Sequence, residues 1–208
     1  MTKPSGIDVS SYVITFPTAP VVWRDVFGDD NPVELEVGSG KGLFLANAAT
    51  KHPDRRFLGI ELAKKYAKRA AERVAKRGLS NVKILPDDAR RFLHEFTPAA
   101  SLSAVHIYFP DPWWKKRHRK RRVFCEEFVR DVTRVLKPGG DFHIVTDVEE
   151  YFGVMLALMA EHPEFLPQPL PKLSTPEHEL DYLTNFERKY RIEGRPIYRA
   201  SYRLRETS

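Results

Sequence analysis

The sequence predicts a single α/β domain, built on a mostly parallel sheet with helices on both faces. Three observations lead to this prediction. From Pro32 onward, short apolar runs alternate with longer amphipathic segments, as in chains of β-α units. Glycine and proline mark the ends of several of these segments. The length of 208 residues suits one domain whose core is large enough to need no disulfide or metal.

Apolar runs of four to seven residues mark the strands. The first spans residues 33–37 and leads through a glycine-rich turn into an apolar helix that begins at Leu43. Four further strands are predicted at residues 56–61, 82–85, 103–109 and 141–145.

Periodic apolar positions mark the helices. The residues that recur at every fourth position, and predict a helix ended by Gly78, are Leu62, Tyr66, Ala70 and Val74. A second helix is predicted by Phe124, Phe128, Val132, Val135 and Leu136, and it stops at residues 137–140 (Lys-Pro-Gly-Gly).

The two ends of the chain differ in pattern. After a helix at about 148–161, the proline-rich segment 163–176 is a long connector, and residues 197–204 alternate like a final strand. Residues 1–32 show no sustained period and are interpreted as an irregular lead-in. The predicted domain therefore covers residues 33–208.

The composition argues against a disordered, disulfide-bonded or membrane-spanning protein. A hydrophobic content of 42% with 30% charged residues argues against wholesale disorder, and the net charge of +6 favours a polyanionic partner. Cys125 is the only cysteine, so no internal disulfide can form. The N-terminus has no signal-peptide core, and the longest apolar run, residues 154–160, is too short to span a bilayer. We expect a cytoplasmic protein with no membrane partner.

The turn after the first strand is a candidate cofactor loop. Gly38, Gly40 and Gly42 lie at every second position, and Glu36 precedes them by two residues. Glycines at a strand-to-helix turn let a ligand approach the backbone amides closely. Leu43 stands where a dinucleotide-binding motif needs glycine, and the phosphate-binding P-loop pattern is absent. A structural glycine turn is the alternative interpretation.

Acids follow the next two strands. Glu61 ends the second strand, where a carboxylate can accept from both hydroxyls of a ribose. Asp87 and Asp88 follow the third, where an acid can accept from the amine of an adenine. Asp88 could instead cap the helix that begins at Ala89. Carboxyl ends of parallel strands meet at one edge, so these acids predict one ligand site.

The fourth strand leads into the most distinctive stretch of the chain. Residues 109–114 read Phe-Pro-Asp-Pro-Trp-Trp, and seven of the eight residues 115–122 are lysine or arginine. The cations can hold phosphates while Asp111 and the two tryptophans meet a base. Taken separately, each piece has a plainer interpretation: a turn aspartate, a core tryptophan and a solvated charge run.

The motifs together resemble one family, the bacterial tRNA (guanine-N7-)-methyltransferases. The resemblance rests on the E-x-G-x-G-x-G loop, residues 105–122, the Thr-Asp-x-Glu-x-Tyr sequence at 146–151 and the Thr-Asn-Phe-Glu-Arg sequence at 184–188. It covers residues 33–204 and implies a Rossmann-like class I methyltransferase fold. It also implies methyl transfer from S-adenosyl-L-methionine to N7 of a guanosine in the tRNA variable loop.

The resemblance assigns roles by matching position. It implies cofactor contacts for Glu36, Gly38, Gly40, Gly42, Glu61, Asp88 and Asp111, with Asp111 also catalytic. It implies substrate contacts for Lys115, Asp147, Thr184, Asn185, Phe186 and Glu187. It implies RNA contacts for Arg117, His118, Arg119, Lys120, Arg121 and Arg122. The chain departs from the family pattern at Asp87, Trp114 and Asn185, and the last replaces a usual cation.

The chemistry of the target atom agrees with this assignment. Guanine N7 carries an in-plane lone pair and no proton, so alignment of the reactants can supply roughly 7 to 11 kcal/mol without a strong base. Asp111 is therefore better interpreted as a residue that orients the base. His52, His94, His106 and Cys125 lack metal-ligand spacing, and we expect no metal site.

Two other functions stay open from the sequence. Asp111, Pro112 and Trp113 also resemble the Asp-Pro-Pro-aromatic motif of methyltransferases that act on exocyclic amines of nucleobases, although the second proline is absent. A non-catalytic RNA-binding module could use residues 115–122 as a clamp. Tyr151 is expected in the core rather than in the site.

Overall fold

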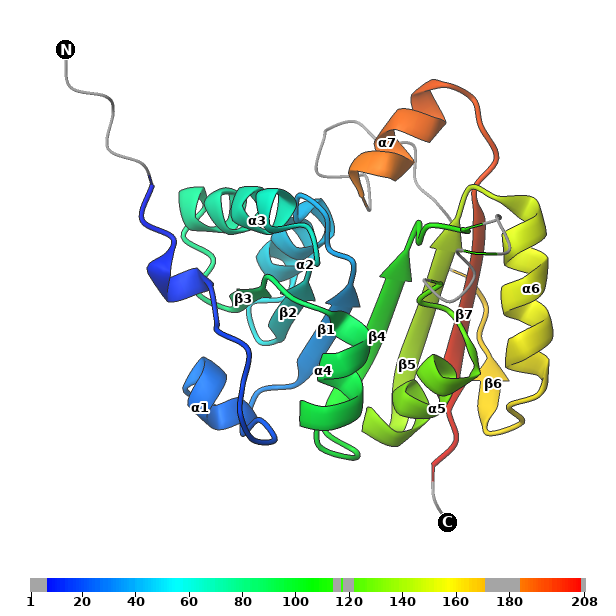
Figure 1. Ribbon diagram of the computed structural model, residues 1–208, viewed down its shortest axis with the longest axis horizontal. Helices are drawn as coiled ribbons and strands as arrows, with labels where there is room; N and C mark the ends of the chain where they lie inside the picture. The colour runs from blue at the N-terminus through cyan, green and yellow to red at the C-terminus, as the bar shows by residue number, and fades with distance from the viewer. Residues whose placement is uncertain (1–6, 114–116, 118–121, 171–183, 207–208) are drawn as a thin grey trace.

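The computed structural model describes residues 7–113, 117, 122–170 and 184–206 (Figure 1). Its strands are β1 (Val33–Val37), β2 (Arg56–Ile60), β3 (Val82–Leu85), β4 (Leu102–Tyr108), β5 (Leu136–Thr146), β6 (Phe165–Pro167) and β7 (Tyr198–Leu204). Its helices are η1 (Ser10–Tyr12), α1 (Trp23–Phe27), α2 (Leu43–Lys51), α3 (Lys64–Lys76), α4 (Ala89–Phe96), α5 (Glu126–Val135), α6 (Glu149–Ala160) and α7 (Asn185–Ile192).

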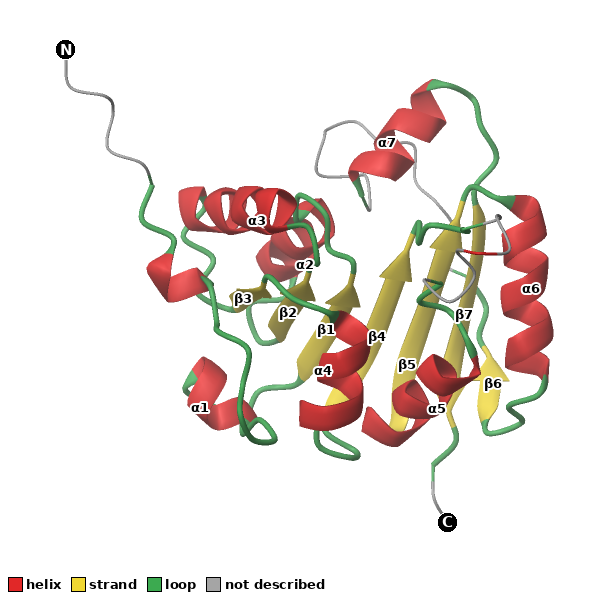
Figure 2. Cartoon of the chain, in the orientation of Figure 1, coloured by secondary structure: helices red, strands yellow, loops and turns green. Residues whose placement is uncertain are grey.

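The strands form a seven-stranded sheet in the order β3-β2-β1-β4-β5-β7-β6. The pairs from β3 to β5 are parallel, and β7 runs antiparallel between β5 and β6. Helices cover both faces of this sheet (Figure 2). The predicted fold class is confirmed.

Two apolar layers hold the helices on the sheet. On one face, Phe92 of α4, Phe128 of α5 and Met155 of α6 pack with the strand residues in a single cluster. On the other, Phe44 of α2 and Ala70 of α3 pack over β2 and β3. None of the described helices is long and apolar enough to cross a membrane.

Helix α3 is shorter and less apolar than its spacing predicted. Ala67, Ala70, Ala71 and Val74 form its buried face. Leu62 precedes the helix and is 70% exposed, and Tyr66 is 43% exposed. The four-residue spacing was therefore wrong about these two side chains. Gly78 follows the helix with φ of 62°, as expected of a residue that ends it.

The predicted turn at 137–140 belongs to a strand instead. β5 begins at Leu136, directly after α5, and its register on β4 shifts between Leu102 and Ala104. Gly139 takes up a φ of 76° within this irregular start. Leu136 pairs with Leu102 and Asp141 with Ala104, so residues 137–140 loop out of the pairing and the predicted glycine turn lies within the bounds of the strand.

The N-terminal segment is less irregular than expected. Val13 forms a parallel bridge to Ile84 at the edge of β3, and the ring of Phe16 lies 4.9 Å from that of Phe96. Trp23, which begins α1, packs on the same core cluster. Residues 13–23 therefore pack along the outside of β3 and α4. The boundary at residue 33 remains a prediction.

Candidate active site

The sheet brings the acids of the sequence motifs to one edge. Val37 of β1 pairs with Ile60 of β2 and with Ile107 of β4, and Ile60 pairs with Leu85 of β3. The strands therefore end nearly level, and the loops after them start side by side. In Figure 1, α7 lies beyond this edge, above the tips of β4 and β5.

The glycine loop presents its backbone to this edge. Gly38, Gly40 and Gly42 have φ of 73°, 54° and 68°, in the region that only glycine adopts without strain. A Cβ built on Gly38 or Gly40 would meet no atom within 4 Å, whereas on Gly42 it would meet Ala70 Cβ at 2.8 Å. The loop is therefore open on the ligand side and pressed against α3 behind.

Glu61 is tied to this loop. Its carboxylate accepts hydrogen bonds from the Gly40 amide at 2.8 Å and from the Ala63 amide at 2.8 Å. Because one of these bonds comes from the glycine loop, the acid after β2 is attached to the loop after β1. A ribose diol would compete with these amides for the same two oxygens.

Glu36 is the buried acid of the site. It is 3% exposed, and burial, together with the charge of Glu61, raises the pKa of its carboxyl well above the ordinary value. Within the described residues, Glu36 Oε2 and Ser39 Oγ are buried without a hydrogen-bond partner. A buried carboxyl and hydroxyl of this kind fit a ligand that supplies N–H or O–H donors and positive charge.

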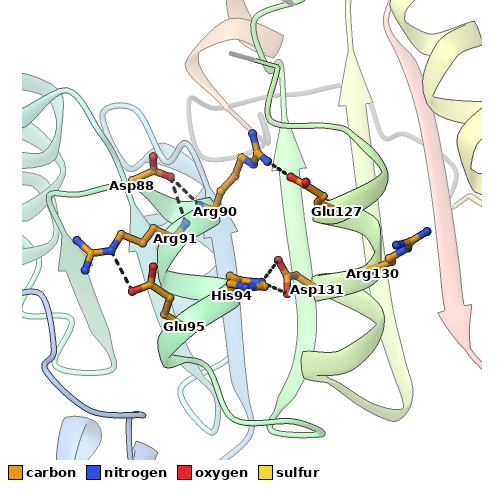
Figure 3. A pocket seen from close by; sticks show the side chains of 8 residues that line it. All are labelled: Asp88, Arg90, Arg91, His94, Glu95, Glu127, Arg130 and Asp131. Atoms are coloured by element: carbon orange, nitrogen blue, oxygen red, sulfur yellow. Dashed lines mark hydrogen bonds and ion pairs between the residues drawn. The ribbon is translucent and has the colours of Figure 1, made fainter. Parts of the chain in front are cut away.

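Asp88 is used as a helix cap. Its carboxylate accepts from the amides of Arg90 at 2.9 Å and Arg91 at 3.4 Å, as the alternative interpretation predicted. Figure 3 shows it at one end of a charged groove between α4 and α5. Within that groove Arg90 pairs with Glu127 and Arg91 with Glu95, and His94 Nδ1 lies 3.1 Å from Asp131 Oδ1.

Asp111 lies on a strained loop after β4. Phe109 and Trp113, two residues to either side, have φ of 52° and 40°, values that are uncommon for residues other than glycine. Asp111 is exposed between its two prolines. Strain held by the surrounding structure is typical of functional loops. The sequence could not have predicted it, because both residues are aromatic.

Arg122 braces this loop. Its Nε donates to the Pro112 carbonyl at 2.7 Å, and its guanidinium lies 5.3 Å from the centre of the Tyr151 ring. Tyr151 is fully buried, as expected, and burial raises the pKa of its hydroxyl to about 12. The last cation of the basic run thus contacts the protein itself. Arg117 is exposed.

The Thr-Asn-Phe-Glu sequence forms the start of α7. The Thr184 hydroxyl accepts from the Glu187 amide at 3.0 Å, which is an N-cap. Glu187 is 2% exposed and pairs with Arg199 of β7 and Arg191. Phe186 is 51% exposed and lies 5.9 Å from the Phe109 ring. Two of the four residues in this segment that were expected to contact the substrate, Thr184 and Glu187, therefore stabilise the helix, and Phe186 reaches the Asp111 loop.

Asp147 has a partner that the sequence did not reveal. Its carboxylate forms an ion pair with Arg195, whose guanidinium lies 4.0 Å from the Tyr190 ring centre. Tyr190 in turn lies 5.5 Å from Phe109. Residues that follow β4, β5 and α7 are thus connected by one set of contacts. Lys115, His118, Arg119, Lys120 and Arg121 lie outside the described residues, as does the side chain of Asn185.

A buried polar network lies behind the site, and sequence reasoning missed it. His106 contacts Tyr108 Oη at 2.7 Å through Nδ1 and Glu34 Oε2 at 2.9 Å through Nε2. His143 stacks on His106 with 4.9 Å between ring centres. The signal was present, because Glu34 and Glu36, like His106 and Tyr108, lie at alternate positions of buried strands.

Solved structures with the same architecture define the fold. A 16S rRNA methyltransferase, KamB, superposes with a TM-score of 0.63 at 18% identity over 88% of this chain and 92% of its own. A SAM-dependent O-methyltransferase from Thermotoga maritima gives 0.56 at 18% identity over 92% and 69%. The fold is that of the class I, Rossmann-like S-adenosylmethionine-dependent methyltransferases.

Sequence relatives define the family. Residues 30–200 match the family model described as "Putative methyltransferase". A tRNA (guanine-N(7)-)-methyltransferase of Rhodopirellula baltica is 43% identical over 98% of this chain and 78% of its own. The corresponding protein of Geobacter metallireducens is 37% identical over 95% of both chains. The chain belongs to the tRNA (guanine-N7-)-methyltransferase family, and its methyl donor is S-adenosylmethionine.

Proposed function

We propose that this protein transfers the methyl group of S-adenosylmethionine to N7 of a guanosine in the variable loop of tRNA. Membership of the family supports the reaction. The roles proposed for individual residues rest on one observation. The glycine loop, Glu36 and Glu61 lie at the same edge of the sheet as the Asp111 loop. We further propose that the enzyme acts in the cytoplasm with tRNA as its macromolecular partner.

The glycine loop and the two glutamates hold the donor in this proposal. Bound S-adenosylmethionine supplies an electrophilic methyl group on a sulfonium. Gly38 and Gly40 leave room for a close approach to their amides, and Glu36 offers a carboxyl oxygen that no described residue satisfies. Glu61 exchanges its bond to the Gly40 amide for ribose hydroxyls. Asp88 contributes through its position at the start of α4 and through the carboxylate oxygen that does not cap.

Asp111 orients the target base. Its carboxylate can accept from N1–H and N2–H of guanine, which turns N7 toward the donor and offsets the positive charge that the ring acquires. N7 has no proton to lose, so the reaction needs neither a strong base nor a metal. The strained backbone of Phe109 and Trp113 fixes the direction in which Asp111 points.

The remaining contacts hold the RNA around that base. Phe186 provides an exposed aromatic face beside the Asp111 loop, and base stacking on such a face is worth roughly 1 to 3 kcal/mol. Asp147, Lys115 and the basic run from Arg117 to Arg122 complete the substrate side in this proposal. Thr184 and Glu187 act by fixing the position of α7.

One incubation tests the reaction. The purified protein is given an unmodified tRNA transcript and methyl-labelled S-adenosylmethionine, and the labelled nucleoside is identified by chromatography and mass. We expect N7-methylguanosine. Label on an exocyclic amine would replace the proposed reaction with amine methylation. Tight tRNA binding without any label would indicate a non-catalytic module.

The role of Asp111 is tested by Asp111→Ala. We expect turnover to fall at least about a hundredfold, because removal of one transition-state contact typically costs that much. The dissociation constant for tRNA should stay within a few fold. Asp54→Ala, at an exposed turn after α2, is the matched control and should leave both quantities unchanged. Equal losses of turnover and of tRNA affinity in Asp111→Ala would contradict the role.

A further inference from the structure

The outward face of α3 is strongly basic. Residues 64–77 contain seven lysines and arginines and a single acid, Glu72. Ala67, Ala70, Ala71 and Val74 point into the core, so the cations occupy the opposite side of the helix. Six of these cations are exposed: Lys64, Lys65, Lys68, Arg69, Lys76 and Arg77.

This face opposes the local rules of helix stability. The first turn of α3 contains no acid and instead begins with two lysines, where the positive end of the helix dipole disfavours cations. Lys64 with Lys68, and Lys65 with Arg69, are like-charge pairs four residues apart. Among the described residues, no carboxylate forms an ion pair with these four cations.

Other helices of the same protein neutralise their arginines. Arg91 of α4 pairs with Glu95 at 3.1 Å, and Arg130 of α5 pairs with Glu126 at 2.8 Å, each four residues away. The excess positive charge is therefore a local property of α3. A side-chain pattern that lowers the stability of its own helix is expected where a ligand compensates for it.

The basic face adjoins the proposed active site. α3 follows Glu61 by three residues, and Ala70 packs so closely on Gly42 that no Cβ fits between them. Lys41, from the glycine loop, places its ammonium 5.8 Å from the ring centre of the half-exposed Tyr66. In Figure 1, α3 and α7 both lie on the side of the molecule toward which β4 and β5 point.

Two segments account for the positive charge of the whole chain. Residues 64–77 carry a net charge of +6, and residues 115–122 carry +7, whereas the complete chain carries only +6. The rest of the protein is therefore net acidic. A polyanion that is attracted to the Asp111 loop meets a second site of attraction at α3 and repulsion elsewhere.

We propose that the basic face of α3 binds the phosphodiester backbone of the RNA substrate at a distance from the target guanosine. This inference rests on the proposed function and adds a second anchor to it. Lysines that contact phosphates position an RNA without reading its sequence. An anionic membrane is a poorer partner, because the apolar side of α3 is buried and cannot insert into lipid.

The test uses the full-length protein with Lys64→Ala and Lys68→Ala combined. The matched control combines Lys51→Ala and Lys137→Ala, which remove two exposed lysines, one at the end of α2 and one near the start of β5. Dissociation constants for unmodified tRNA transcript are measured at several salt concentrations. Loss of two phosphate contacts should weaken binding about 10- to 30-fold near physiological salt and lower the salt slope by about 1.5 to 2.

Three further measurements separate this anchor from other effects. S-adenosylmethionine affinity and the midpoint of thermal unfolding should match wild type, and turnover at saturating tRNA should be unchanged while KM rises. Equal tRNA affinities in the two double variants would overturn the proposal. Binding of the Lys64→Ala, Lys68→Ala variant to phosphatidylserine vesicles is also measured, and loss of vesicle binding with tRNA binding intact would overturn the proposal as well. A wild-type protein that binds tRNA but makes no N7-methylguanosine would instead contradict the proposed function and leave the anchor testable.

Discussion

At the scale of single residues, Glu36 shows how the site depends on a group that the fold alone does not favour. Its carboxyl is buried beside Glu61, and its pKa is raised by burial first and by that neighbouring charge second. An acid whose pKa is higher in the folded than in the unfolded protein lowers stability as the pH rises above its unfolded value. The presence of a carboxyl at this buried position is explained if a bound cationic ligand favours the charged form of Glu36.

Glu36→Gln tests this explanation. In the wild-type protein, binding of S-adenosylmethionine should release a proton and become tighter as the pH rises, because the cationic ligand lowers the raised pKa of Glu36. The variant should bind more weakly without releasing that proton, and it should unfold at a higher temperature at pH 8. Calorimetric titrations in buffers of different ionisation enthalpy measure the proton. An unchanged proton count in the variant would exclude Glu36 as its source.

Glu34 behaves in the opposite way. Burial raises the pKa of its carboxyl. The hydrogen bond from His106 and the Arg55 guanidinium at 2.6 Å lower the pKa by a larger amount, so that its value is about 2. A lowered pKa contributes stability above the unfolded value of about 4.5, and that stability is lost as the pH falls toward 2. The network thus stabilises the strands behind Glu36 at neutral pH.

We expect Glu34→Gln to lower the free energy of unfolding by about 3 kcal/mol at pH 7 and by only about 1 kcal/mol at pH 3. Urea unfolding at the two pH values measures the difference. Glu150→Gln, on the exposed side of α6, is the control and should change little at either pH. A loss of equal size at both pH values would show that packing, rather than charge, holds the network.

At the scale of elements, small residues decide how closely helices approach the site. The buried face of α3 consists of three alanines and a valine, which lets the helix lie directly against the glycine loop. Because Gly42 and Ala70 leave no space for a Cβ, the loop cannot move toward α3 unless the helix also shifts. We therefore expect the position of α3 to limit the position of the glycine loop.

Two glycine substitutions should have opposite effects. Gly42→Ala adds a Cβ at 2.8 Å from Ala70 Cβ, in a backbone with φ of 68°, and should lower both stability and S-adenosylmethionine affinity. Gly153→Ala, in α6, adds a Cβ that meets nothing within 4 Å and should stabilise by about 0.5 to 1 kcal/mol. Urea unfolding and cofactor titration measure both. A Gly42→Ala protein with normal affinity would show that the loop moves independently of α3.

At the scale of the whole molecule, the N-terminal segment closes one side of the fold. The edge of β3 would otherwise be unpaired, and Val13 and Ile14 bond to it through the Ile84 backbone. Phe16 then packs edge-on against Phe96 and beneath the Arg91 guanidinium at 4.7 Å. The segment lacks periodicity because it contacts a different element every few residues.

Phe16→Ala should therefore lower the free energy of unfolding by about 2 to 3 kcal/mol, as expected for loss of a partly buried ring. Ile7→Ala, at a side chain that is 42% exposed, should change it by less than about 0.5 kcal/mol. Chemical denaturation of both variants provides the comparison. Equal stabilities of Phe16→Ala and wild type would support the interpretation of this segment as a lead-in.

Local patterns predicted most of the fold and misjudged its irregular parts. β1 and β3 match the predicted ranges residue for residue, because each is a short segment rich in β-branched and apolar residues that ends at turn residues. The start of β5 was missed, because Leu136 pairs with β4 four residues before the glycines end, while residues 137–140 have no partner among the described residues of β4. Leu62 was misplaced because period alone does not say where a helix begins.

The sequence by itself determined the order of the elements, the glycine loop, and the placement of acids at the carboxyl ends of the parallel strands, because spacing and residue type are local properties of a chain. The cap that Asp88 forms on α4 is local and could be predicted from the sequence. Only the tertiary structure decided that Glu61 bonds to the glycine loop and that Asp147 pairs with Arg195. These partners come from hydrogen bonds and charges that arise when separate segments meet at the edge of the sheet, and no single segment encodes them.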